Sequence, residues 1–196
     1  MDISITGFRP VEIDQIAVDL EDDSSDPVDG FDADWLALAP VSSLADIWQL
    51  GDHRLLCGDA RKPATVNQLM GRHRAAMAFL DPAYNLRIKG TVGRGRIKHD
   101  EFAMASGELS RGDFVAFLID SLGVAASVCQ DGAIHFVCMD WRHVGELFEA
   151  AQAVYGATLN LAVWVKSNAG QGSFYRNQHE LVGVFRVGHE PHAFQA

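Results

Sequence analysis

The sequence predicts an α/β protein with a mostly parallel sheet that ends in an antiparallel strand pair. Apolar runs of strand length alternate with stretches of helix length over residues 54–166, and this alternation is typical of parallel sheets. The last two apolar runs, residues 159–166 and 181–187, follow one another without a helix between them, so we expect them to pair antiparallel. The sequence contains no internal repeat.

Length and composition indicate one well-buried core. The chain has 196 residues, 48% of them hydrophobic, and no apolar stretch is long enough to span a membrane. The first residues lack the basic region and long apolar core of a secretion signal. An odd number of cysteines without a CxxC pair fits reduced thiols rather than disulfides or a zinc site. We therefore expect a cytoplasmic protein without a structural metal.

Charge is distributed unevenly along the chain. Residues 1–50 contain twelve acidic residues and one basic residue, whereas residues 51–196 contain fourteen acidic and fifteen basic residues. Seven of the basic residues lie between Arg72 and Lys98. A strongly acidic protein is a poor partner for nucleic acid, but here the acidity belongs to the leader alone. The sequence thus predicts an acidic leader, residues 1–50, and a body, residues 51–196.

The leader is expected to hold little regular structure. Residues 10–20 have proline in a first-turn position and early acidic residues, which is typical of a short helix. Residues 21–34 indicate a flexible acidic linker, because the regular spacing of a calcium-binding loop is absent. Apolar residues at 35–40 and 47–50 are expected to dock the leader on the body.

The body is expected to alternate strands and helices. Ser110 is placed to cap the clearest helix, and Pro63 and Gly71 bound a shorter one at residues 63–70. The remaining predicted elements are strands at residues 54–57, 75–80, 133–139, 159–166 and 181–187 and a helix at residues 141–155. Residues 85–108 form a long glycine-rich, basic stretch, and loops of this length are usually functional or mobile.

An acid and an aromatic residue follow the predicted strand at residues 75–80. Asp81, Pro82 and Tyr84 come directly off its carboxyl end, where ligands and chemistry gather in open α/β sheets. An Asp-Pro turn with a tyrosine packed beneath it is the purely structural alternative. The flanking sequence favours a functional site.

The ordered motifs of the body resemble those of the amino-methylating DNA methyltransferases. These enzymes transfer a methyl group from S-adenosylmethionine to adenine N6 or cytosine N4, and the resemblance is to the permuted class, in which the catalytic half precedes the cofactor half. The matching segments are Cys57-Gly58-Asp59-Ala60, Phe79-Leu80-Asp81-Pro82-Ala83-Tyr84-Asn85, Trp164-Val165-Lys166-Ser167-Asn168, Phe174-Tyr175-Arg176 and His179-Glu180. The acidic leader resembles members that carry a ParB-like domain upstream. The resemblance covers about residues 45 to 190 and implies a Rossmann-like methyltransferase sheet.

The resemblance assigns catalytic roles to Asp81, Pro82 and Tyr84. A base in duplex DNA must be flipped out before its amine can react, and the Tyr84 ring would offer the flipped base a π-face. Asp81 and the Pro82 carbonyl would accept the amine hydrogens and direct the nitrogen lone pair toward the methyl group, while the Pro82 ring fixes the turn.

The resemblance also implies a cofactor site at Gly58, Asp59 and Asp81, with Asp59 near the adenine of S-adenosylmethionine. The alternative for Asp59 is an acid that caps the helix beginning at Pro63. Double-stranded DNA is the expected partner, with contacts from the basic loop and the later loop; an ordinary solvated loop is the alternative for the basic stretch. The expected DNA-contacting residues are Asn85, Arg87, Lys89, Arg94, Arg96, Lys98, Tyr175 and Arg176. A metal pair at His179 and Glu180 is not expected, because neighbours in a strand point to opposite faces.

The sequence departs from the family pattern at two places. Ala83 stands where the family has a second proline, which leaves the turn freer. The glycine-rich F-x-G-x-G turn that cradles the cofactor's methionine part is absent from this chain. The resemblance implies that two strands are then missing between the strands at 54–57 and 75–80. We therefore expect weak stability, self-association, or pairing with a C-terminal cofactor half.

Other functions remain open at this point. The chain could be a catalytically silent α/β module that binds nucleic acid or a protein partner. Methylation of a protein glutamine or of RNA by a related sheet ranks lower, since those relatives typically have Asn where Asp81 stands.

Overall fold

The computed structural model describes residues 39–87, 102–167 and 177–192. The chain divides into two compact units, Met1–Val41 and Ser42–Ala196, and every helix and strand described below belongs to the second. The expected leader helix at 10–20 and the linker at 21–34 lie outside the described residues. The leader-and-body division at residue 50 stays a prediction.

A β-hairpin opens the second unit. Strands β1 (Ile47–Leu50) and β2 (His53–Leu56) pair antiparallel, with Leu50 opposite His53 across the turn at Gly51, whose φ is +62°. Residues 47–50, which were expected to dock the leader on the body, pair with β2, whose residues belong to the predicted body. They form a strand because Gly51-Asp52 makes a two-residue turn, and Trp48 and Leu50 stay exposed.

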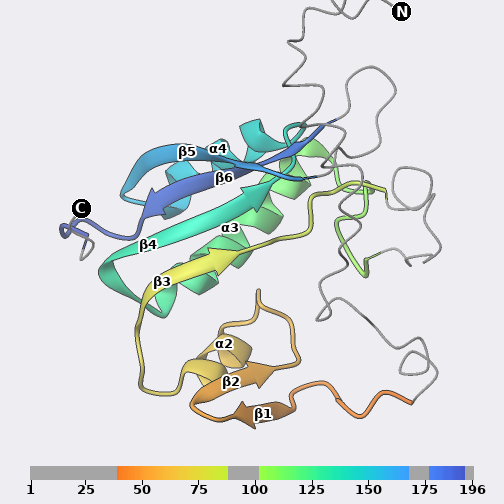
Figure 1. The fold of residues 1–196 in the computed structure, drawn as a ribbon, viewed down its shortest axis with the longest axis vertical. Helices are drawn as coiled ribbons and strands as arrows, with labels where there is room; N and C mark the ends of the chain where they lie inside the picture. The colour runs from red at the N-terminus through yellow and green to blue at the C-terminus, as the bar shows by residue number, and fades with distance from the viewer. Residues whose placement is uncertain (1–38, 88–101, 168–176, 193–196) are drawn as a thin grey trace, which may run out of the picture. The chain divides into compact units, whose positions relative to one another are not determined.

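The main sheet has four strands in the order β3-β4-β6-β5 (Figure 1). Strands β3 (Ala75–Leu80) and β4 (Cys129–Met139) are parallel, whereas β6 (His179–Arg186) lies antiparallel between β4 and β5 (Ala157–Val165). The antiparallel pair at the end of the chain is confirmed. The sheet is mixed rather than mostly parallel, because β6 inserts between two strands of the opposite direction and β2 pairs with β1 instead.

Strand β3 is an edge of this sheet. Its one partner among the described strands is β4, and β2 is not hydrogen-bonded to it. A separation between the first and second predicted strands, at residues 54–57 and 75–80, was expected from the family resemblance, and the strand order of the described residues agrees with it. An unpaired edge exposes backbone N–H and C=O groups that can pair with another strand.

Three helices accompany the strands. Helix α2 (Pro63–Met70) has the predicted bounds, starts with proline and ends at Gly71 with a positive φ. Helix α3 (Arg111–Ser127) begins at the predicted cap, where the Ser110 hydroxyl accepts the Asp113 N–H. Helix α4 (Val144–Val154) follows β4. None of the helices in the described ranges is long and apolar enough to cross a membrane.

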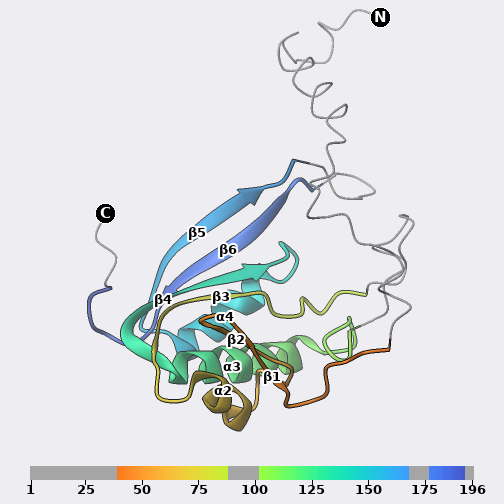
Figure 2. The same ribbon diagram turned by 60° about the horizontal axis from the view of Figure 1, so that its bottom comes forward.

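Helices α3 and α4 cover one face of the sheet (Figure 2), and the core lies between them and the strands. Leu118, Leu147 and Phe185 are fully buried there. The opposite face of β3 is different: Met77 is 50% exposed and Phe79 is 62% exposed. Since side chains alternate along a strand, one face of β3 packs on the helices and the other stays open in the described structure.

Candidate active site at the carboxyl edge of the sheet

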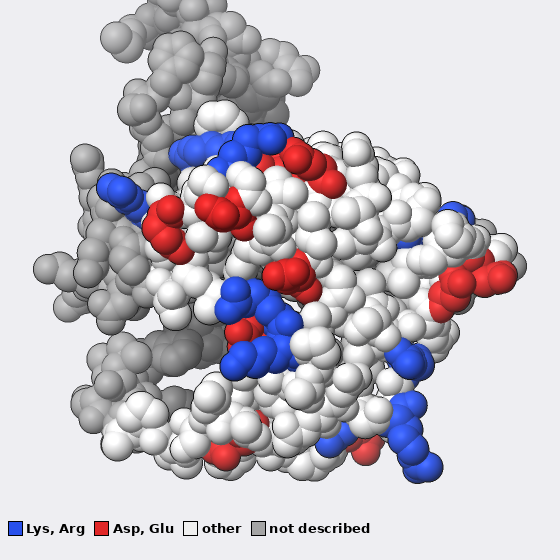
Figure 3. Space-filling model, turned by 180° about the vertical axis from the view of Figure 1, so that it is seen from behind, with Lys and Arg blue, Asp and Glu red and all other residues white. Residues whose placement is uncertain are grey.

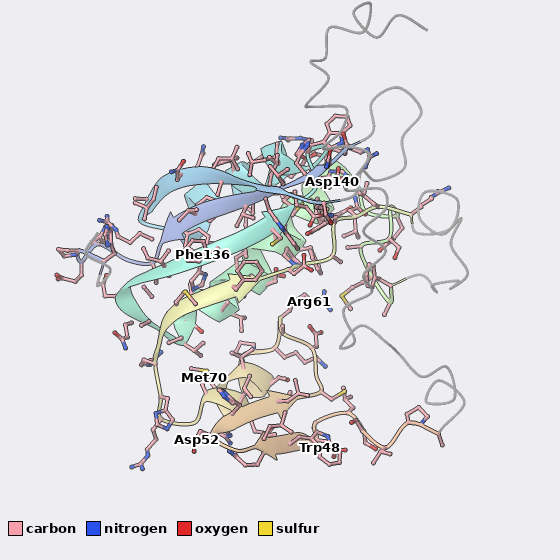
Figure 4. All side chains as sticks on the ribbon, in the orientation of Figure 1. Trp48, Asp52, Arg61, Met70, Phe136 and Asp140 are labelled. Carbon is pink, nitrogen blue, oxygen red and sulfur yellow. The ribbon has the colours of Figure 1, made fainter. Side chains whose placement is uncertain are left out.

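Charged side chains that follow or begin the strands gather at the carboxyl edge of the main sheet, that is, at the end where β3, β4 and β5 finish. Asp81 comes after β3, Asp140 comes after β4 (labelled in Figure 4), Lys166 comes after β5, and Glu180 lies at the start of antiparallel β6. The strand register brings these ends together, because Leu80 is opposite Val137, Met139 opposite Leu181, and Val165 opposite His179. This is the edge at which α/β sheets place their ligands.

The Tyr84 hydroxyl links three of these groups. It donates to Asp81 Oδ1 at 2.6 Å and lies 3.4 Å from Glu180 Oε2. The other Glu180 oxygen, Oε1, accepts from Lys166 Nζ at 2.7 Å. Two predicted catalytic residues, Asp81 and Tyr84, are thus in direct contact, and Pro82 lies between them in the chain. Asp81 is exposed, whereas Pro82 and Tyr84 are half-buried.

The phenol of Tyr84 is held in its neutral form. Burial raises the pKa of Tyr84 far above its usual value, and the hydrogen bond to Asp81 and the nearby charges of Asp81 and Glu180 raise it further. A neutral phenol has one proton to donate. At this edge Tyr84 therefore acts as a hydrogen-bond donor beside two carboxylates.

Asn85 has a structural role beside the Asp81–Tyr84 turn. The residue is 8% exposed and its φ is +52°. The amide Nδ2 donates to Leu109 O at 3.0 Å, and Oδ1 accepts the N–H groups of Gly107 and Leu109 at 3.0 and 3.2 Å. These bonds hold the Asp81–Tyr84 turn against the segment before α3. A DNA contact from Asn85 stays a prediction.

Gly58 and Asp59, the predicted cofactor residues, lie between β2 and α2. The Asp59 carboxylate accepts from Arg61 N at 3.0 Å, Nε at 3.1 Å and Nη2 at 2.9 Å, and these bonds lower the pKa of Asp59. Asp59 does not cap α2: the residue at the cap is Lys62, without a side-chain hydrogen bond. The capping alternative was therefore wrong. Among the described residues, no hydrogen bond or ion pair joins Asp59 to the Asp81–Tyr84 pair.

Arg61 connects this loop to the helix layer. Its guanidinium lies 5.5 Å from the centroid of the Phe117 ring of α3, and Figure 4 shows Arg61 on the loop above α2. The Gly58 position is crowded, since a Cβ there would approach Thr65 Cγ2 at 2.6 Å and Leu56 Cδ2 at 2.7 Å. Both observations explain this segment by local packing, and its cofactor contact stays a prediction.

The predicted DNA-contacting residues lie mostly beyond the described ranges. Arg87 is exposed at the end of one described segment. The others, Lys89, Arg94, Arg96, Lys98, Tyr175 and Arg176, lie outside the described residues. On the face drawn in Figure 3, basic and acidic side chains are intermixed. Ion pairs of the described residues include those of Arg111 with Glu146 and Glu149.

Lys166 and Glu180 are the residues of this site that the sequence analysis did not assign to it. A basic residue at the end of one strand and an acidic residue at the start of the next, antiparallel strand would have been the signal. Their contact depends on the hairpin register, in which Lys166 N also donates to Gln178 O at 2.8 Å. That register cannot be derived from spacing when eleven or more residues separate the strands.

Comparison with known proteins gives little further guidance. No protein-family profile matches the chain, and no curated protein matches it. Among solved structures, the chain is similar to one described as the crystal structure of the M1.HpyAVI–SAM complex, with a TM-score of 0.37 and 8% sequence identity. The match covers 63% of this chain and 53% of the other, so the chain corresponds to about half of that protein's length.

Proposed function

We propose that this chain carries the base-binding and amine-activating part of a DNA methyltransferase that modifies adenine N6 or cytosine N4. The observation that carries the proposal is the contact of an exposed Asp81 carboxylate with the half-buried Tyr84 hydroxyl at the carboxyl end of β3. The order of the sequence motifs around this pair supports the proposal.

The chemistry of the pair suits an exocyclic amine. Such a nitrogen is a weak nucleophile because its lone pair is conjugated with the ring. A carboxylate that accepts one N–H draws the lone pair out of conjugation, and Asp81 is exposed at the sheet edge, where a substrate can reach it. The Pro82 carbonyl would take the second N–H, and the exposed part of the Tyr84 ring would contact the base.

The described residues do not form a complete cofactor site. The Asp59 carboxylate is occupied by Arg61, and the chain contains no F-x-G-x-G turn. We therefore derive no step that runs through S-adenosylmethionine. The methyl donor, bound with the help of Gly58, Asp59 and Asp81 or by residues of a partner chain, remains part of the proposal, as does double-stranded DNA as the substrate.

Transfer of a labelled methyl group to DNA tests this function. We expect Asp81→Ala to lower transfer by at least about 100-fold, the range of a lost acid–base group. Tyr84→Ala should lower it by about 5- to 150-fold if the ring stacks on the base, at about 1–3 kcal/mol. Glu149→Ala is the control: Glu149 lies on α4 and pairs with Arg111, so transfer should change less than threefold. Unchanged transfer in both site variants would refute the assignment.

A catalytically silent binding module is the second candidate, and the unpaired edge of β3 favours it. Such a module would bind DNA or a partner strand without the methyl donor. Calorimetry distinguishes the two: the silent module shows DNA binding that weakens with salt and no heat with S-adenosylmethionine, whether or not DNA is present. Binding of the donor by the protein would favour the enzyme.

A further inference from the structure

At the carboxyl edge of the sheet, the single hydroxyl proton of Tyr84 lies near two carboxylates, those of Asp81 and Glu180. Tyr84 Oη lies 2.6 Å from Asp81 Oδ1 and 3.4 Å from Glu180 Oε2, so Asp81 holds the hydrogen bond and Glu180 lies just beyond ordinary hydrogen-bonding distance. The separation to Glu180 must shorten by roughly 0.7 Å to reach the usual O–H···O distance of about 2.7 Å. Rotation of the hydroxyl and a small shift of the ring suffice for that change.

Glu180 is fixed in place as the second acceptor. Lys166 Nζ holds its Oε1 at 2.7 Å, which leaves Oε2 directed at Tyr84. Lys166 is itself restrained, because its ammonium lies 5.8 Å from the Trp164 ring centroid and its backbone N–H is bonded to Gln178 O. An acceptor that is already held in position costs little further side-chain entropy when it takes a new proton donor.

In this arrangement the Tyr84 hydroxyl is hydrogen-bonded to Asp81, which would accept one N–H of an amine substrate. The Pro82 carbonyl would accept the other. A hydrogen bond of 2.6 Å to a carboxylate is a strong charge-assisted one, and it withdraws electron density from Asp81. Asp81 is a better acceptor for the amine once that bond is released. The released phenol then needs another acceptor, because it is half-buried and an unpaired buried hydroxyl is unfavourable.

We propose that the Tyr84 hydroxyl switches its hydrogen bond from Asp81 to Glu180 when an amine substrate binds Asp81. Lys166 and Glu180 are positioning residues for this exchange. The inference rests on the proposed function for its substrate, but the exchange itself is a property of four side chains in this chain. It assigns a role to a Lys–Glu pair that does not touch the reacting amine.

The Cys138 thiol also faces this network, but it does not compete for the hydroxyl proton of Tyr84. The Cys138 thiol is buried, and its pKa is raised by burial and by the charges of Asp81 and Glu180, so it stays a neutral thiol. A thiol is a weak acceptor compared with a carboxylate. Among the described residues, Asp81 and Glu180 are therefore the two acceptors available to the Tyr84 hydroxyl.

The exchange can be tested without enzymatic activity. The chain has three tyrosines, so labelling with ¹³Cζ-tyrosine gives three signals, and Tyr84→Phe assigns one of them. We expect Asp81→Ala to keep the Tyr84 hydroxyl bonded, now to Glu180, with a slowly exchanging hydroxyl proton. The double variant Asp81→Ala/Glu180→Leu removes both acceptors and should shorten the lifetime of that proton at least tenfold, and Asp81→Ser replaces Asp81→Ala if the latter does not fold.

Two further variants separate positioning from general packing. Lys166→Met keeps the length of the side chain but removes its charge, so in the Asp81→Ala background it should shorten the hydroxyl lifetime, and Lys166→Arg should restore it. Glu149→Ala, on α4, should change neither the lifetime nor the ¹³Cζ shift. If Glu180→Leu has no effect on the Tyr84 signal in the Asp81→Ala background, the exchange is refuted.

Kinetics distinguish failure of the exchange from failure of the proposed function. In methyl transfer to DNA, Glu180→Leu should lower kcat about tenfold and leave KM for DNA within twofold, because DNA does not contact Glu180 in this scheme. A hydroxyl that responds to Glu180, together with methyl transfer that is unchanged in Asp81→Ala, would leave the exchange standing and refute the function. Methyl transfer that is insensitive to Glu180→Leu, with an unresponsive hydroxyl, would refute the exchange alone.

Discussion

Two tyrosine hydroxyls in this protein are hydrogen-bonded in opposite environments. Tyr84, at the edge of the sheet, donates to a solvent-exposed carboxylate beside a Lys–Glu pair. Tyr155, inside the core, lies 2.8 Å from Nδ1 of His135, whose side chain is 0% exposed. His135 Nε2 is in turn 3.1 Å from Cys129 Sγ. The partners of Tyr84 are charged side chains near the surface, whereas the partners of Tyr155 lie inside the core.

Burial keeps the inner chain neutral. It lowers the pKa of His135 to about 4 and raises the pKa values of Tyr155 and Cys129. The Cys129 thiol has Ala125 O as an acceptor at 3.2 Å, so the simplest assignment has His135 Nε2–H donating to sulfur and Tyr155 O–H donating to Nδ1. Every polar side-chain atom of Tyr155, His135 and Cys129 then has a hydrogen-bond partner. The comparison teaches that a phenol in the core stabilises this fold, whereas a phenol at the edge is available for chemistry.

The largest expected effect contrasts two phenylalanines. Phe185 is fully buried and stacks on Tyr155 with ring centroids 4.8 Å apart, so Phe185→Ala should destabilise the protein by about 3–5 kcal/mol. Phe79→Ala, the same change on the open face of β3, should cost less than about 1 kcal/mol. Chemical denaturation measures both. Equal losses would show that the open face is covered in the folded protein in solution.

Stability should fall on acidification because of His135. Its folded pKa of about 4 lies below the unfolded value of about 6.5, so the unfolded chain binds the proton first. The contribution is therefore fully present above about pH 6.5 and declines toward pH 4, by up to about 3 kcal/mol. Denaturation of the wild type and of His135→Gln at pH 4, 5.5 and 7 tests this. Parallel pH profiles for the two proteins would contradict it.

Asn85→Ala should loosen the turn that carries the edge group. It leaves the N–H groups of Gly107 and Leu109 without their acceptor, at a cost of about 2 kcal/mol. Asn85→Gly loses the same bonds but tolerates the positive φ, so it should be about 1 kcal/mol more stable than Asn85→Ala. Thermal denaturation compares the two, and a less stable glycine variant would argue against strain at this residue.

The smallest expected effect compares the two hydroxyls directly. Tyr155→Phe leaves His135 Nδ1 without its partner and should cost about 1–3 kcal/mol. Tyr84→Phe removes a hydroxyl from a partly exposed edge, where water can replace it on Asp81, and should cost less than about 1 kcal/mol. The same denaturation experiment measures both. A larger loss at Tyr84 would reverse the comparison and make the edge group part of the stable core.

Local signals in the sequence predicted much of the fold. The bounds of α2 and β3 agree with prediction, and α3 begins at the Ser110 cap, because helix starts depend on the nearest few residues. Asp81 and Tyr84 could be named as a pair for the same reason, since only two residues separate them. Residues 47–50 were not recognised as a strand, because their pairing with β2 depends on the turn at Gly51.

The sequence by itself determined most of the segments that form strands and helices, and the acid and the aromatic residue that follow β3. Only the tertiary structure decided that β6 lies between β4 and β5, and this placement brings Glu180 and Lys166 to Tyr84, about ninety residues away in the chain. It also decided that Asn85 turns inward to bind the segment before α3. Strand order and register are set by long-range pairing and burial, which no short stretch of sequence encodes.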